Sequence, residues 1–460
     1  MAITYNVKLG VASTRRNIFS REDAIRCKDE TLAKLRSLGV DCVDLGWLNE
    51  DGLMYDVAHV DAVAQRFRAE GVDALFTPHC NFGNEDSVTR LAAALNVPTL
   101  LWGPRDEAPG PDGLRLRDSQ CGLFATGKDL LRRHIPFTYI ENCRIGDAVF
   151  ESGVKNFIAA ANVVKNFRRL KIGQIDTRPS DFLSVMANEA ELAEKFGIHV
   201  EPWSLNELIA EMDTIRTERA GELADAAKST AERIPFDCDG DGVLAMIAMK
   251  MAMSEWAARK GLSALAIQCW DALHEATGVM PCFANSVMIE EDIPVACETD
   301  LHAAITAVLV QAAAKEPVFI ADVTVRHPDN DNAELLWHCG AFPYSLKKEG
   351  ADGKVGRHYV LPSGAPGVNE WQLKDGEVSI FRFDGIGGDY SLLFAKGKTV
   401  DGPANRGTYV WVEFPDWPAL ERKIVTGPYI HHVIGTYKDA GPILETAIPY
   451  LGPIKFDPAF

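Results

Sequence analysis

Glu298 and Asp322 are the residues whose type and position most clearly suggest chemistry. Glu298 lies in VACETD and Asp322 in FIADV, and each ends an apolar run typical of a buried strand, with one helix's length, Leu301–Lys315, between them. A strand–helix–strand unit makes its two strands parallel, so we expect both carboxylates at the same end of one sheet, where open α/β sheets bind ligands. The pair indicates a hard-metal site or an acid/base pair. Either acid alone could instead cap a helix.

Histidines could complete such a site. His431 and His432 lie in the strand-like run YIHHVIG. Neighbouring strand residues face opposite sides, so at most one of them can point into a given site. His338, in LLWHCG, follows Asp322 by 338 − 322 = 16 residues and is a further candidate. Imidazole added to carboxylates shifts metal preference toward Mn²⁺ or another transition metal, whereas a lone strand histidine is more often structural.

Polar residues also follow two strands near the N-terminus. Arg15 and Arg16 come directly after the first expected strand, and His79 and Asn81 lie in the loop PHCNFGNED after a later one. Both positions are at the ligand-binding end of the expected sheet, where these side chains could contact an anionic or polyhydroxy substrate. The alternatives are a solvated arginine pair and a helix-capping loop.

Two motifs are misleading. DCDGDG, residues 237–242, matches the opening of an EF-hand loop, but its twelfth position would be Ala248 instead of glutamate. We therefore expect a helix cap or turn there. GIGG, residues 385–388, lies between expected antiparallel strands and does not open a helix, so it indicates a turn and no phosphate-binding loop.

The first third of the chain alternates apolar runs with helical segments, which predicts a parallel, doubly wound sheet. The expected helices lie near Arg21–Leu38, Val57–Glu70, Glu85–Leu95 and Glu151–Leu170. The alternation restarts at LKIGQID and predicts a second α/β domain. Its expected helices lie near Phe182–Phe196, Leu205–Thr214 and Gly242–Lys260.

From about His327 the pattern changes to short strands separated by turn residues, including GRHYVLP, GEVSIFRFDG, YSLLFAKG and TYVWVEF. Close spacing of this kind predicts an antiparallel sheet or small barrel. The expected fold is therefore α/β, with two doubly wound parallel-sheet domains followed by a β-rich, antiparallel, barrel-like C-terminal domain. We place the domains at residues 1–169, 170–325 and 326–460, with a final helix near Pro442–Tyr450.

Composition excludes several partner classes. The 460 residues carry a net charge of −18 and a pI of about 5.1, which argues against nucleic acid and anionic membranes as partners. We identify no signal peptide and no apolar stretch long enough to cross a bilayer. The ten cysteines contain no CxxC motif. A cytoplasmic location is expected.

The quoted residues resemble the L-fucose isomerase and L-arabinose isomerase superfamily, as a divergent fucose isomerase-like member. VACETDLHAAITAVLVQAAAKEPVFIADV resembles the segment that holds two metal-binding carboxylates with the spacing found here, 322 − 298 = 24 residues. IHHVIGT resembles the motif that supplies a histidine ligand, with His432 favoured and His431 the alternative. His338 falls where the arabinose branch has a further ligand. GVASTRRN and IQCW, with Gln268 and Trp270, resemble segments near the sugar.

The resemblance implies a metal-dependent aldose–ketose isomerase that works through an enediol intermediate. Glu298 and Asp322 would be both metal ligands and acid/base groups, with Mn²⁺ as cofactor, or Co²⁺ or Mg²⁺ in its place. It also implies a homo-oligomer, a trimer or hexamer, in which the first domain of one subunit covers its neighbour's site. The substrate could be a deoxy sugar, a pentose or an anionic hexose such as a sulfo-sugar. A non-catalytic sugar-binding protein and an epimerase or lyase on the same metal scaffold are the alternatives.

Overall fold

The computed structural model describes residues 2–270 and 272–460. Its residue contacts divide the chain into two compact units. The N-terminal unit comprises Tyr5–Lys165 and Glu445–Tyr450, and the large unit comprises Asn166–Leu444, Leu451–Phe460 and the chain start up to Thr4. The first break lies close to the predicted boundary at residue 169. The further boundary at residue 325 stays a prediction.

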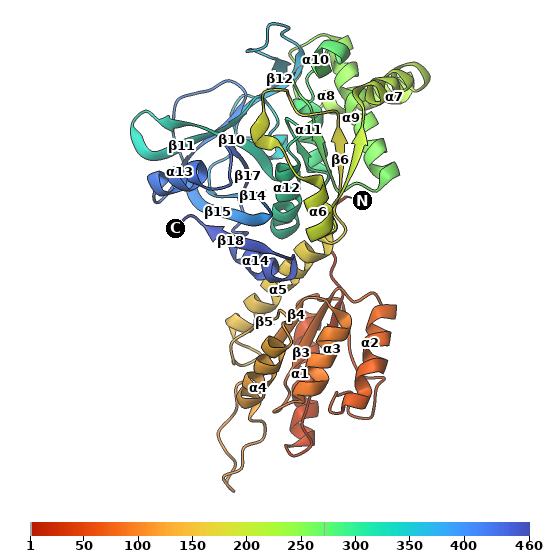
Figure 1. The fold of residues 1–460 in the computed structure, drawn as a ribbon, viewed down its shortest axis with the longest axis vertical. Coiled ribbons are helices and arrows are strands. Elements are labelled where there is room, and N and C mark those ends of the chain that lie inside the picture. Colours follow the sequence, from red (N-terminus) through yellow and green to blue (C-terminus); the bar gives the residue numbers. More distant parts are fainter. Residues whose placement is uncertain (1, 271) are drawn as a thin grey trace. The chain divides into compact units, whose positions relative to one another are not determined.

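The N-terminal unit is built on a parallel sheet with the strand order β2-β1-β3-β4-β5 (Figure 1). The strands are β1 (Leu9–Val11), β2 (Cys42–Val43), β3 (Ala74–Pro78), β4 (Thr99–Trp102) and β5 (Thr138–Tyr139). The helices are α1 (Arg21–Ser37), α2 (Val60–Ala69), α3 (Glu85–Leu95), α4 (Ser119–Arg132) and α5 (Ala148–Phe167). Alternate strand residues face two separate cores, as Phe76 and Leu75 do. Strand order reverses between β1 and β3, whose carboxyl ends form the crevice where such sheets bind ligands.

The large unit begins with a second parallel sheet, of order β7-β6-β8-β9. Its strands are β6 (Lys171–Ile175), β7 (His199–Trp203), β8 (Ala264–Ile267) and β9 (Val295–Ala296). Its helices are α6 (Glu189–Phe196), α7 (Leu205–Glu218), α8 (Ala220–Ala231), α9 (Gly240–Lys260), α10 (Ala272–Thr277), α11 (Cys282–Glu290) and α12 (Leu301–Ala314). The predicted second α/β region is thus present. Helices α8, α10 and α11 were not predicted.

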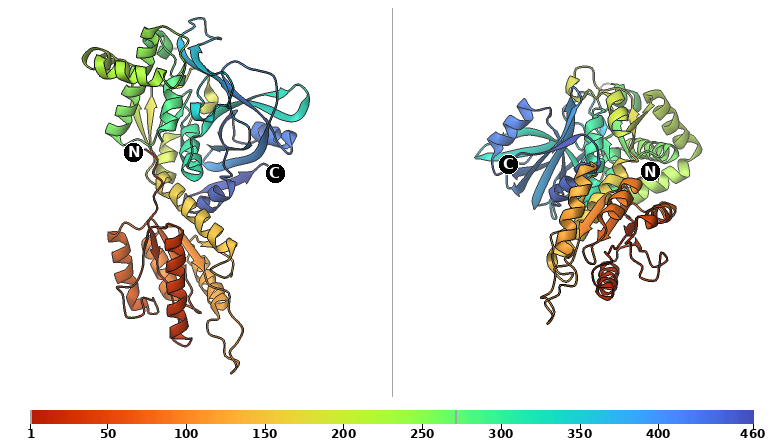
Figure 2. Two further views of the ribbon diagram at one scale, coloured as in Figure 1. Left: turned by 180° about the vertical axis from the view of Figure 1, so that it is seen from behind. Right: turned by 60° about the horizontal axis from the view of Figure 1, so that its bottom comes forward.

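The rest of the large unit is a mainly antiparallel barrel, which Figure 2 shows from two further sides. Six strands close into a ring in the order β16-β11-β10-β17-β14-β15, because β15 also pairs with β16. They are β10 (Phe319–His327), β11 (Asn330–His338), β14 (Glu377–Ile386), β15 (Asp389–Val400), β16 (Thr408–Glu413) and β17 (His432–Thr436). The ring is extended by β12 (Lys354–Arg357), β13 (Pro366–Gln372) and β18 (Ile454–Pro458), and accompanied by α13 (Trp417–Thr426) and α14 (Gly441–Ala447). The predicted α/β fold with a barrel-like end is confirmed.

Helix α12 joins the two sheets of the large unit. All its residues are buried, and it packs against β8 and β9 on one side and β14 and β17 on the other. A helix that is apolar all round is one that is buried all round. The expectation that Glu298 and Asp322 end parallel strands of one sheet is wrong: Glu298 follows β9 of the parallel sheet, whereas Asp322 lies within β10, antiparallel to its barrel neighbours.

Two further predicted elements differ from the observed ones in their bounds. The helix predicted near Phe182–Phe196 begins only at Glu189, because the Asn188 side chain caps it by accepting from the Glu191 amide. The run GRHYVLP is a strand only up to Arg357. Both misleading motifs behave as expected: the Asp239 side chain caps α9, and GIGG turns β14 into β15.

All ten cysteines are free thiols. In the part of the chain that the structure describes, no helix combines the length and apolar character needed to cross a membrane.

Glu334 on β11 is a buried acid inside the barrel. It shares a strand face with Leu336 and lies opposite Val412, both part of the barrel core, and it is 3% exposed. Its Oε2 atom has no hydrogen-bond partner among the described residues. Burial raises the pKa of Glu334 from 4.5 to about 7, and the charge of Arg326 only partly opposes this.

Glu334 should make the protein less stable as pH rises. The folded state holds the Glu334 proton more tightly than the unfolded chain does, so stability is full below about pH 4.5 and is lost as pH rises through about 7. Glu334→Gln mimics the protonated acid and should match wild type at pH 5 but exceed it by about 3 kcal/mol at pH 8. Urea unfolding at both pH values measures this. The exposed Glu377→Gln is the control, and equal pH slopes in wild type and Glu334→Gln would exclude the assignment.

Candidate metal centre

Glu298, Asp322 and His338 gather around His432, between the parallel sheet and the barrel. Glu298 and His338 form one group of possible metal ligands with His432, and Asp322 and His431 form another. The His432 Nε2 atom lies 3.3 Å from Asp322 Oδ1 and 3.6 Å from Glu298 Oε2. The His338 Nε2 atom lies 3.7 Å from the same Glu298 oxygen. Register places Asp322 of β10 directly opposite His432 of β17. The barrel therefore supplies three of these side chains, and the loop after β9 supplies Glu298.

Several polar atoms that face this point lack partners. Glu298 Oε2, Asp322 Oδ1 and His338 Nε2 are buried atoms without a hydrogen bond to any described residue. Buried polar groups are nearly always satisfied, so a cluster of unsatisfied ones indicates a missing ion or ligand. Two carboxylate oxygens and an imidazole nitrogen are a suitable ligand set for Mn²⁺ or a related divalent ion.

The histidines differ in which nitrogen is free. His432 Nδ1 lies 2.8 Å from Asp300 Oδ2, which places a proton on Nδ1 and leaves the Nε2 lone pair free to bind a metal. The backbone N–H of Cys339 donates to Nδ1 of His338 at 3.0 Å. Because Nδ1 accepts in this bond, Nε2 is the nitrogen of His338 that carries a proton toward the cluster. His432 is thus suited to be a ligand, and His338 to be a hydrogen-bond donor.

Mutual charges set the protonation of the cluster. Burial alone would raise the pKa of Glu298, but the rings of His338 and His432 lower it to about 2. Burial likewise opposes the charged form of His432, yet Asp300, Asp322 and Glu298 together raise its pKa. The carboxylate of Glu298 is therefore held in its ionised form, as a metal ligand must be.

A buried ionic network supports His432 from behind. Asp300, which also caps α12, lies 2.5 Å from the Arg382 guanidinium. Arg382 is fully buried on β14 and also pairs with Asp384 at 2.7 Å. Asp384 in turn lies 2.8 Å from His302 Nδ1. Sequence reasoning did not single out Asp300 or Arg382, although a charge inside the apolar run VSIFRF was a usable signal.

The backbone at Glu298 is strained. Glu298 and Thr299 have φ of 53° and 56°, in the left-handed region that β-branched threonine in particular avoids. Such conformations cost on the order of 1–3 kcal/mol each and cluster at functional sites. The turn directs Glu298 away from the parallel sheet toward the barrel histidines.

Trp270 and Gln268 follow β8 beside the cluster. The Trp270 indole N–H donates to Glu298 Oε1 at 2.8 Å, and the residue is 42% exposed. Gln268 donates to the Thr177 carbonyl, while its own Oε1 lacks a partner among the described residues. Phe182, which was not predicted, stacks on Trp270 with ring centroids 6.0 Å apart.

His431 lies on the outer side of the cluster. β17 begins at His432, so His431 is not yet part of the strand and does not alternate with it. Its Nε2 atom is 3.9 Å from Asp322 Oδ1, and its ring packs on His432. The expectation that at most one of the two could approach the site is therefore wrong. His432 is 2% exposed and central, whereas the His431 side chain is 41% exposed.

The remaining sugar-contact candidates lie in the N-terminal unit, at the crevice between β1 and β3. Arg15 is buried against Asp51 at 2.7 Å. Asn81 Oδ1 accepts from the Arg16 backbone N–H and so ties the loops after β1 and β3 together. The Arg16 side chain is 32% exposed and lies over the ring of Phe82.

His79 is fully enclosed in that unit. Its ring nitrogens lie 3.1 Å from the Thr77 carbonyl and 2.8 Å from the Thr126 hydroxyl. Burial lowers the pKa of His79 to about 4, so the ring stays neutral. These contacts favour a structural part for His79.

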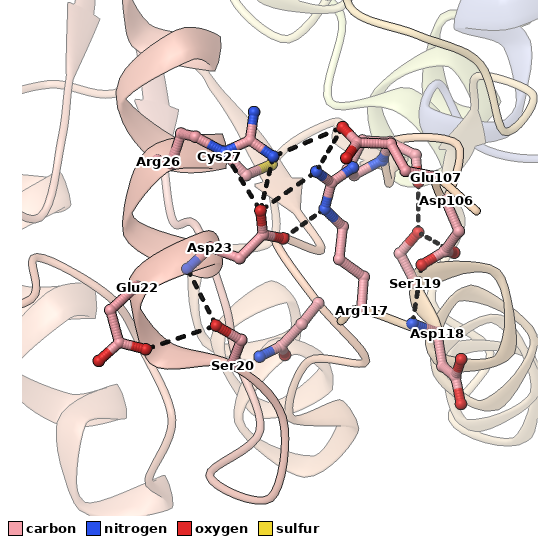
Figure 3. Close-up of polar contacts among 12 residues, drawn as sticks. Ser20, Glu22, Asp23, Arg26, Cys27, Asp106, Glu107, Arg117, Asp118 and Ser119 are labelled. Carbon is pink, nitrogen blue, oxygen red and sulfur yellow. Dashed lines mark hydrogen bonds and ion pairs between the residues drawn. The ribbon is translucent and has the colours of Figure 1, made fainter. Parts of the chain in front are cut away.

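A second ionic cluster in the N-terminal unit was not predicted (Figure 3). Asp23 of α1 accepts from both Arg117 and Arg26, and both guanidinium groups also approach Glu107. Burial would raise the pKa of Asp23, but the two arginines hold it below its usual value. The cluster fixes the loop before α4 against α1.

Comparison with known proteins shows which family the chain resembles. Residues 10–168 match the family model described as fucose/sulfoquinovose isomerase, N-terminal domain. A sulfoquinovose isomerase of Alkalicoccus urumqiensis is 27% identical over 333 residues, covering 72% of this chain and 73% of the relative. Another, of Priestia aryabhattai, is 26% identical over 351 residues, covering 76% and 77%. A third, of Clostridium sp., is 25% identical over 378 residues, covering 79% and 82%.

These matches extend over most of the chain and include the N-terminal unit. They bear out the expected resemblance. The chain is similar to fucose isomerase-like proteins, through a family model over residues 10–168 and through relatives named sulfoquinovose isomerases.

Proposed function

We propose that the protein is a metal-dependent aldose–ketose isomerase whose substrate is a sulfonated aldose. The observation that carries the chemistry is the convergence of two unpartnered carboxylate oxygens on the free Nε2 atom of His432. The sulfonated substrate is favoured because the relatives matched over most of their length are named sulfoquinovose isomerases.

Glu298, Asp322 and His432 would hold the divalent ion, with Mn²⁺ preferred and Co²⁺ or Mg²⁺ as alternatives. When bound, the ion supplies Lewis-acid stabilisation of negative charge on adjacent sugar oxygens. These three side chains would leave positions on the ion free for those oxygens. Asp300 keeps His432 in the tautomer and orientation this requires.

The two acids have different surroundings. Both oxygens of Glu298 already have neighbours. Oε2 faces the two imidazoles, and Oε1 accepts hydrogen bonds from Trp270 and Cys269. Asp322 is more accessible, with its side chain 18% exposed and Oδ1 unpartnered among the described residues. We therefore assign Asp322 as the base that moves the proton between C2 and C1 of the enediol, and His338 Nε2–H as a donor to a sugar oxygen.

The N-terminal unit would contribute the contacts to the rest of the sugar. Arg16 offers a partly exposed guanidinium, which also pairs with Glu85, at the carboxyl ends of β1 and β3. Asn81 holds the Arg16 backbone in place. We propose that this crevice covers the metal centre of another copy of the chain in a homo-oligomer, which would exclude water from the enediol.

Glu298→Gln should abolish both metal binding and turnover. The amide keeps the side chain's size but removes the charge that holds the cation. Elemental analysis after loading with Mn²⁺, followed by an isomerase assay, measures both effects. Glu291→Gln, at an exposed glutamate of the same unit, is the matched control and should keep both. Full Mn²⁺ occupancy in Glu298→Gln would remove Glu298 from the ligand set.

Asp300→Asn should weaken Mn²⁺ binding about 10- to 100-fold, the usual effect of losing an outer-shell partner. It also weakens a buried ion pair, so stability should fall by up to about 3–5 kcal/mol. Asp384→Asn is the control, because it weakens the same Arg382 pairing without contacting His432. Metal titration and thermal unfolding of both variants separate the two effects. Equal metal affinity in Asp300→Asn and Asp384→Asn would contradict the positioning role.

Metal-loaded protein should convert sulfoquinovose to its ketose with kcat/KM about 10- to 100-fold above that for glucose, since a charge-assisted hydrogen bond is worth about 1.5–3 kcal/mol. Product analysis across neutral, deoxy, phosphorylated and sulfonated aldoses measures this. Absence of ketose from every sugar would exclude the isomerase, and equal use of glucose would exclude the sulfonate preference. Solvent deuterium at C2 without ketose would indicate an epimerase, and tight sugar binding without metal a binding protein.

A further inference from the structure

Glu298 presents its two oxygens to two chemically different sets of side chains. Oε2 faces the imidazole nitrogens of His338 and His432. Oε1 instead lies 3.0 Å from the Sγ atom of Cys269, and Cys297 directly precedes Glu298 in the chain. The two sulfur atoms and a Glu298 oxygen all lie within 4.8 Å of one another, and all three residues are buried.

We propose that Cys269, Cys297 and Oε1 of Glu298 form a second cation site, selective for a thiophilic divalent ion such as Zn²⁺ or Cd²⁺. A tetrahedral Zn²⁺ ion with Zn–S bonds of about 2.3 Å places its sulfur ligands about 3.8 Å apart, which the cluster accommodates. Thiolate ligands select soft ions, whereas the carboxylate and imidazole set on the other side suits Mn²⁺. Glu298 would bridge the two ions, as carboxylates do in two-metal sites.

A fourth polar group points to the same place. The Asn285 side chain is fully buried and lies 3.4 Å from the Cys297 sulfur through its Nδ2 atom. Its Oδ1 atom has no hydrogen-bond partner in the described part of the chain. Rotation of the amide brings that oxygen to the sulfur-facing side, where it could complete the coordination.

Binding of the divalent ion by the two cysteines balances in charge and in protons. Each thiol releases one proton to solvent as the ion binds, and the two thiolates neutralise its double positive charge. The charge of Glu298 remains available to the ion on the Oε2 side. The site thus goes beyond the proposed isomerase and does not require turnover. Without it, Cys269 and Cys297 would simply pack with Ala341 as small apolar groups.

Titration of the Mn²⁺-loaded full-length protein with Cd²⁺ tests the site, with the ultraviolet thiolate-to-cadmium absorption band as readout. We expect one Cd²⁺ per chain with this band, while Mn²⁺ is retained by elemental analysis. Cys269→Ser and Cys297→Ser should each lower Cd²⁺ affinity by more than about 100-fold, because loss of even an outer-shell partner costs 10- to 100-fold. Circular dichroism checks that both variants fold.

Cys143→Ser is the matched control, because Cys143 is a buried thiol of the N-terminal unit whose polar contact is the Trp102 indole N–H. It should leave the band unchanged. A band of unaltered strength in Cys269→Ser or Cys297→Ser, or release of Mn²⁺ in proportion to Cd²⁺ bound, would overturn the proposal. Neither result depends on isomerase activity, so failure here is distinct from failure of the proposed function.

Discussion

The buried guanidinium of Arg382 is the interaction on which the metal centre depends. A charge without solvent is tolerated only when it is paired and hydrogen-bonded, and Asp300 and Asp384 satisfy Arg382 from two sides. Asp300 is at once the cap of α12, the partner of Arg382 and the acceptor for His432. One carboxylate therefore links the helix start, the barrel wall and the metal ligand. Movement of any one of them would leave a charge unpaired in the core.

Helix α12 explains how two different sheets build one site. Its apolar sequence between Leu301 and Ala314 packs on β8 and β9 and on β14 and β17, so its N-terminus lies where the parallel sheet meets the barrel. The helix itself could be predicted within a residue from its apolar run. Its sheet partners could not, because a strand that continues a parallel sheet and one that opens a barrel look the same locally. The two acids were predicted at the ends of parallel strands of one sheet. They instead come from two different sheets, and each approaches His432.

Residue type revealed the metal-binding side chains more readily than the residues that position them. Glu298, Asp322 and His432 carry unusual groups at the ends of apolar runs, and that pattern is visible in the sequence. Asp300 has the same residue type as any helix cap, and its contacts with Arg382 and His432 span more than eighty residues of chain. Long-range pairing of this kind leaves no local spacing to recognise.

The strained turn at Glu298 determines which side chains each of its two carboxylate oxygens meets. If β9 continued in extended conformation, successive side chains would alternate across the sheet and Asp300 could not cap α12. Left-handed φ at both Glu298 and Thr299 instead reverses the chain within two residues, and the Thr299 and Asp300 amides donate to the Ile267 and Cys297 carbonyls. The cost, on the order of 1–3 kcal/mol per residue, is offset by these bonds and by the ionic network behind them. The same turn holds one oxygen of Glu298 among imidazoles and the other beside thiols, so backbone strain sets which chemistry each oxygen meets.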